Sequence, residues 1–67
     1  MTKEEAKELI AFIKSHLPAK VGGFVMEDDQ VTKLYVSTLW GVLNGEAVRK
    51  HEIIDATFAA AHDWLGY

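Results

Sequence analysis

The chain has 67 residues, no cysteine, and a formal net charge of −3 from seven basic and ten acidic side chains. This length leaves no room for a second domain, and the 49% hydrophobic content is too high for a disordered tail. The lack of thiols excludes a disulfide framework, a zinc ribbon and a cysteine nucleophile. The mild acidity argues against a nucleic-acid-binding domain, because such domains usually carry an excess of basic residues.

The N-terminal segment has the pattern of a capped amphipathic helix. Thr2 and Glu5 fit a capping box, in which each side chain accepts a hydrogen bond from the other residue's free backbone N–H. Apolar residues recur at helical spacing from Ala6 to Leu17. Pro18 disfavours helical conformation at the residue before it, so we expect the helix to end there.

The middle segment supports two interpretations. A helix from Asp28 or Asp29 to about Leu43 gathers apolar residues on one face, and Asn44-Gly45 then supplies a left-handed C-cap. The alternative is an α+β fold with a short hairpin between residues 21 and 37, flanked by two helices, because residues 31–36 are rich in strand-forming types. We favour the helix for its longer periodicity and its caps at both ends, and the conformation of residues 31–37 stays open.

The C-terminal segment has a helical pattern from about Glu46 to Leu65. Its apolar residues recur at helical spacing, and four alanines add strong helix propensity. Three helices in succession predict an all-α fold, a small three-helix bundle that forms a single helical domain over residues 1–67.

The predicted second helix is apolar around most of its circumference. Two other helices cannot cover all of its sides, so we expect some of this surface to be exposed unless the connector at residues 21–26 covers it. Tryptophan is also frequent in the energetically dominant part of interfaces. The residues that we predict to bind a partner are Trp40, Val36, Phe12, Tyr35 and Leu43.

These features predict a non-catalytic interaction protein, such as an inhibitor, an adaptor or an accessory factor of the kind that phages encode. Its partner is another protein or a second copy of itself. The sequence shows neither a signal peptide nor an apolar run long enough to span a membrane, so we expect a free-standing cytoplasmic protein that does not bind membranes.

The main rival hypothesis is a helix-turn-helix DNA-binding regulator. Arg49 and Lys50 would open its recognition helix just after the turn at Gly45, and Lys33 would add a further contact. Nucleic acid is nevertheless the less favoured partner, because Glu46 and Glu52 lie beside these basic residues and would repel phosphates.

Catalysis and metal binding are not predicted. His51 and Asp55 have the i, i+4 spacing of two ligands on one helix, but a metal site needs ligands from elsewhere in the chain. A chain of this length also has little room for a pocket that excludes water. We therefore expect no enzyme activity, no cofactor and no metal.

Overall fold

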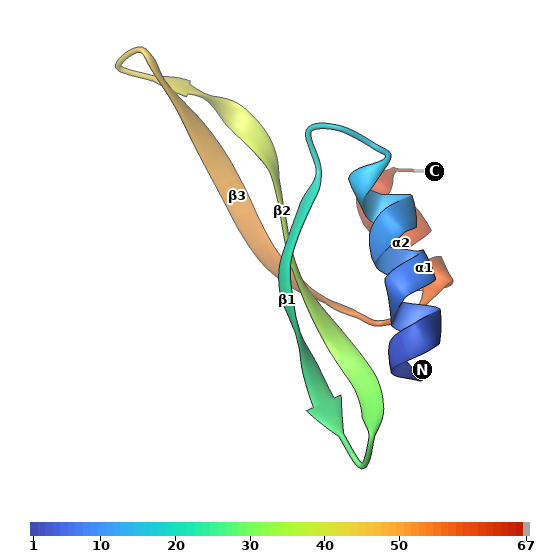
Figure 1. Ribbon diagram of the computed structural model, residues 1–67. Helices are drawn as coiled ribbons and strands as arrows, with labels where there is room; N and C mark the ends of the chain where they lie inside the picture. The colour runs from blue at the N-terminus through green and yellow to red at the C-terminus, as the bar shows by residue number, and fades with distance from the viewer. Residues whose placement is uncertain (67) are drawn as a thin grey trace.

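The computed structural model describes residues 1–66 and contains a three-stranded antiparallel sheet with two helices packed on one face (Figure 1). The elements follow one another as α1 (Lys3–Lys14), β1 (Lys20–Glu27), β2 (Gln30–Leu43), β3 (Glu46–Asp55) and α2 (Phe58–Leu65). The strand order is β1-β2-β3, so β2 is the central strand. The predicted all-α bundle is therefore wrong, since strands make up 48% of the chain and helices 30%.

Strands β2 and β3 form a long hairpin where two helices were predicted. Asn44 and Gly45 have positive φ angles of 53° and 82° and connect Leu43 to its partner Glu46. An Asn-Gly pair is the preferred sequence for a two-residue turn in which both residues have positive φ. The same dipeptide is also common at the C-terminus of a helix. Because we interpreted it as a helix C-cap, we did not predict this hairpin.

Strands β1 and β2 form the hairpin of the alternative interpretation. Asp28 and Asp29 make its two-residue turn, with φ angles of 50° and 63°, and Glu27 pairs with Gln30. Aspartate tolerates this left-handed conformation better than most residues, because its short polar side chain can hydrogen-bond locally. The alternative did not anticipate β3, and it assigned to a long helix the residues that form this third strand.

Both helices are capped by threonine. At α1 the predicted capping box is confirmed: Thr2 Oγ1 accepts from the Glu5 N–H at 3.2 Å, and Glu5 Oε1 accepts from the Thr2 N–H at 2.9 Å. At α2, Thr57 Oγ1 accepts from the Ala60 N–H at 3.0 Å. Neither helix within residues 1–66 combines the length and the apolar character needed to cross a bilayer.

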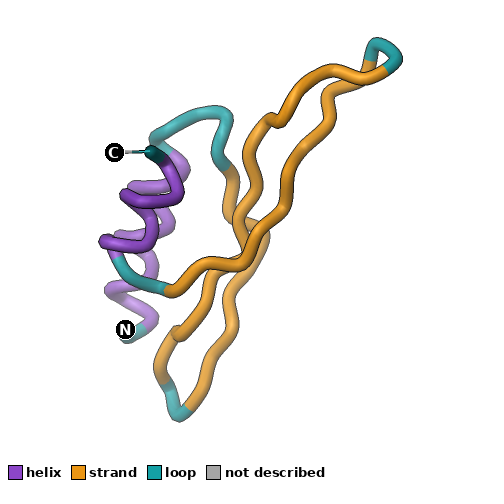
Figure 2. Tube along the Cα trace, turned by 180° about the vertical axis from the view of Figure 1, so that it is seen from behind, coloured by secondary structure: helices purple, strands orange, loops and turns teal. Residues whose placement is uncertain are grey.

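The core lies between the two helices and the face of the sheet that they cover. Leu34 and Val36 of the central strand are 0% and 2% exposed, and they pack with Leu9 and Ile13 of α1. Val31 and four alanines complete the core, and one of these alanines is Ala61 of α2. Both helices lie over one part of the sheet, and the end of the β2–β3 hairpin projects beyond them (Figure 2).

The capping box makes the stability of α1 depend on pH. Hydrogen bonds from the backbone N–H and the side chain of Thr2 lower the pKa of Glu5 below its ordinary value. The pKa of Glu5 is therefore lower in the folded chain than in the unfolded chain. The ionised carboxylate stabilises the fold at pH values above the unfolded pKa. That contribution is lost as the pH falls through the lowered, folded pKa.

We expect Glu5→Gln to lose less stability than the wild type between about pH 5 and pH 3. Urea unfolding followed by circular dichroism at several pH values measures this difference. Glu4→Gln is the matched control, because it removes another first-turn carboxylate and its ion pair with Lys7 but leaves both hydrogen bonds of the capping box in place. An unchanged pH dependence in Glu5→Gln would contradict the assignment.

Candidate interaction surface

Strands β2 and β3 extend well past the point where β1 begins. Strand β1 pairs with β2 only as far as Lys20 opposite Ser37, whereas β3 pairs with β2 as far as Leu43 opposite Glu46. Beyond Ser37 the sheet therefore has two strands, and this part projects away from both helices (Figures 1 and 2). We call residues 38–50 the distal ribbon.

The distal ribbon carries four large apolar side chains on its β2 strand. Trp40 is 71% exposed and Val42 is 72% exposed, while Leu43 and Leu39 are 61% and 44% exposed. Only Gly41 interrupts this run of residues 39–43, and residues 34–45 contain no charged side chain. Several large apolar side chains exposed close together often mark a site of interaction with a protein or a membrane, or a ligand groove.

The structure separates the five residues that we predicted to bind a partner. Trp40 and Leu43 lie together on the distal ribbon, and Tyr35 is half-exposed on the sheet face that the helices leave open. Val36 is in the core, because in a strand it points opposite to Tyr35 and toward the helices. Phe12 is half-buried between the helices, where its ring stacks on His62 at a centroid distance of 5.0 Å.

Two exposed residues of the distal ribbon, Leu39 and Val42, were missed by the sequence analysis. On a helix they would have faced the predicted core, so no partner role was assigned to them. The uncharged run that ends in Asn44-Gly45 was the available signal, since it reads equally well as one strand of an apolar hairpin.

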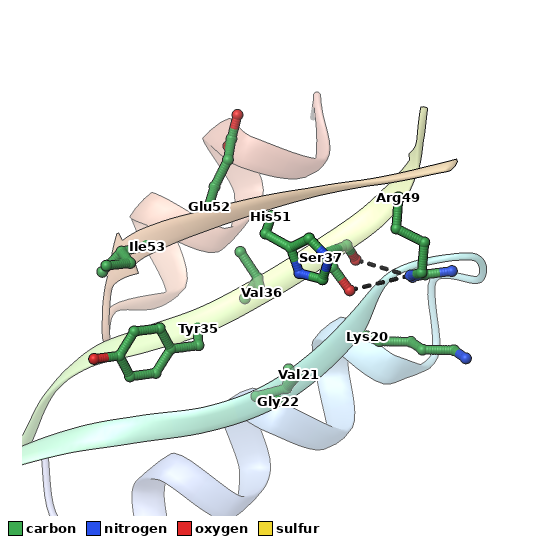
Figure 3. Close-up of a pocket in the computed structure, with 10 residues that line it drawn as sticks. All are labelled: Lys20, Val21, Gly22, Tyr35, Val36, Ser37, Arg49, His51, Glu52 and Ile53. Carbon is green, nitrogen blue, oxygen red and sulfur yellow. Dashed lines mark hydrogen bonds between the residues drawn. The ribbon is translucent and has the colours of Figure 1, made fainter. Parts of the chain in front are cut away.

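A second surface feature is a hollow of about 790 Å³ on the open face of the sheet. Tyr35 and Ile53, which are cross-strand partners, lie at one end of it, and Lys20 and Arg49 lie at the other (Figure 3). Its apolar end is formed by half-exposed side chains, and its polar end is occupied by a hydrogen-bonded cluster around Ser37.

Arg49 connects three segments of the chain at the base of the distal ribbon. Its Nη2 donates to the carbonyl oxygen of Pro18 at 2.5 Å and to that of Ser37 at 3.3 Å, and its Nε donates to Ser37 Oγ at 3.2 Å. Ser37 is the buried polar side chain of the core region, at 8% exposed. The guanidinium thus connects β3 to β2 and to the loop before β1. We infer that the role of Arg49 is structural.

The helix-turn-helix arrangement predicted for DNA binding does not form, because residues 30–43 and 46–55 are strands. The other two basic residues of that hypothesis are paired with acidic side chains on the sheet. Lys50 contacts Glu52 at 3.0 Å, and Lys33 contacts Asp55.

The metal-ligand spacing considered for His51 and Asp55 also fails, since both residues belong to strand β3. On a strand, residues four apart lie about 13 Å apart rather than on adjacent turns. Across residues 1–66, no group of three or more histidine, aspartate or glutamate side chains is placed to hold a metal ion.

Comparison with known proteins adds no relative: no family model, curated protein or solved structure matches the chain. The functional argument therefore depends on the surface of the molecule itself.

If Arg49 has a structural role, Arg49→Ala will destabilise the fold by about 1–3 kcal/mol, because the buried Ser37 loses its partner. Lys50→Ala is the matched control, since it removes a neighbouring charge from an exposed pair and should change stability by less than about 0.5 kcal/mol. Urea denaturation at one fixed protein concentration gives both values. Equal effects of the two substitutions would rule out the assigned role of Arg49.

Proposed function

We propose that this protein is a non-catalytic interaction protein that binds a protein partner, or a second copy of itself, through the distal ribbon. The observation that carries the proposal is the exposure of four large apolar side chains on a two-stranded hairpin that neither helix covers. In this proposal the protein acts in the cytoplasm as an inhibitor, an adaptor or an accessory factor.

The energetics of apolar burial support this role. Covering a large apolar side chain that is otherwise in water gains about 1.5–3 kcal/mol. Trp40 offers the largest such surface, and tryptophan is enriched among residues that dominate binding energy. A hairpin of two strands is also only marginally stable by itself in water, so a partner that covers the distal ribbon would order it.

The proposal assigns no role to the hollow on the open face of the sheet. Its most polar part, around Ser37 and Arg49, is occupied by hydrogen bonds that hold the fold together. Tyr35 and Ile53 lie on the same face and extend the apolar surface toward the body of the molecule.

Site-specific photo-cross-linking tests the proposal. Replacing Trp40 with the photoreactive p-benzoylphenylalanine keeps a large aromatic side chain in place, and irradiation of cells that express the protein should give covalent adducts. Glu8, an exposed residue on α1, is the matched control position and should give few adducts or none. No adduct at position 40, or equal yields at the two positions, would contradict the proposed function.

A further inference from the structure

We infer that the occupant of the distal ribbon is a second copy of this chain, which pairs with the free edge of β2 around a two-fold axis at Gly41. The inference rests on the proposed function and identifies the partner. It follows from the length of the free edge, its lack of charge and the residues that the symmetry brings together.

The free edge is a short backbone template with defined ends. Residues 39–43 of β2 have β3 on one side, and on the other side β1 pairs no further than Ser37. An edge strand presents N–H and C=O groups that another strand can pair with. Two such hairpins joined edge to edge would make a four-stranded sheet, which is stable where an isolated hairpin is marginal.

The ends of this edge limit what can pair with it. A partner strand must be about five residues long and must stop where β1 begins at Lys20. Residues 39–43 of a second copy meet both limits when they run antiparallel, because the Asn44-Gly45 turn of that copy ends its strand beside Ser37. A longer foreign strand could not continue its pairing past Ser37, because Lys20 of β1 already pairs with β2 there.

The symmetry brings the exposed apolar side chains opposite one another. With Gly41 on the axis, Trp40 lies opposite Val42 of the second copy, and Leu39 lies opposite Leu43 of the second copy. Pairs between an aromatic and a β-branched residue are among those that stabilise antiparallel sheets. All four exposed apolar residues of the edge thus acquire an apolar cross-strand neighbour.

Charge does not oppose this pairing. Each chain has a net charge of −3, but residues 34–45 include no lysine, arginine, aspartate or glutamate, so the paired strands bring no like charges together. Pairing of the two edges also brings the exposed apolar side chains of one copy next to those of the other, which removes part of their surface from water.

The pairing of β2 with β3 passes from Leu39 opposite Arg49 to Gly41 opposite Val48, so a β-bulge at Trp40 immediately precedes Gly41. Its φ angle lies outside the left-handed region, and a Cβ atom at this position would meet nothing within 4 Å. Glycine inside a strand is common at bulges and at places where another backbone approaches closely. The free space around Gly41 also means that a side chain introduced there leaves the packing of the single chain intact.

Charge swapping at Gly41 tests the inference. We expect the wild type to sediment at twice the 7.5 kDa of one chain at micromolar to millimolar concentrations. Gly41→Glu and Gly41→Lys should each halve that mass, because the axis places two like charges directly opposite each other. Mixing the two variants in equal amounts should restore the doubled mass, since opposite charges then meet.

Gly22→Glu is the matched control, because Gly22 also lies in a strand and a Cβ there meets nothing within 4 Å. This variant should keep the doubled mass, and circular dichroism should show wild-type strand content in all variants. A monomeric wild type, a failure of the mixture to restore the dimer, or a monomeric Gly22→Glu would each overturn the inference.

The two tests separate the inference from the proposed function. A monomeric wild type that still forms adducts with other proteins at position 40 rejects the second copy and leaves the interaction role in place. A chain that neither dimerises nor forms adducts at position 40 rejects both.

Discussion

The architecture depends on a mismatch in length between the central strand and everything that packs beside it. Strand β2 has 14 residues, whereas β1 has 8 and the longer helix has 12. A strand of that length spans about 46 Å and a helix of 12 residues only about 18 Å. The molecule is accordingly 43 Å long, and its helices cannot cover the sheet from end to end. The core forms where they do cover it, and apolar surface is exposed where they do not.

Arg49 marks the boundary between these two parts of the sheet. On one side of it, Val36 and Leu34 face the helices and are buried; on the other, Trp40 and Val42 face solvent. The guanidinium fastens the loop before β1 to both long strands at this boundary. The distal ribbon is thereby held to a well-packed body at its base, so the surface that we propose for binding has a fixed attachment.

The sequence was sufficient to predict α1, because its caps and its apolar spacing are local signals. It was not sufficient for residues 30–55, where the local signals suit either structure. Val31, Tyr35 and Val42 fit one face of a helix, yet their β-branched and aromatic side chains also favour strands. Hydrogen bonding between strands that are separated in the sequence determines that residues 30–55 form strands and not helices. A local sequence pattern does not show which segments pair.

Only part of the candidate site could be predicted from the sequence. The surplus of apolar residues over what a small core can bury implies that some of them are exposed, whichever secondary structure they adopt. The neighbours of Trp40 depend on the period of the side chains. A helical period of 3.6 groups it with Val36, four residues earlier. In the structure Val36 lies where the helices cover the sheet and is buried, whereas Trp40 lies beyond them on the distal ribbon with Leu39, Val42 and Leu43.

The position of the two helices on either side of the three strands in the sequence has a consequence for folding. Leu9 and Ile13 of α1 share one core with Ala61 of α2, although all three strands separate them along the chain. The loop-closure entropy of bringing such distant segments together is lost before their contacts form, so we expect the packing of α2 on α1 to follow the pairing of the strands. Until that packing is complete, the apolar strands are exposed to other unfolded chains.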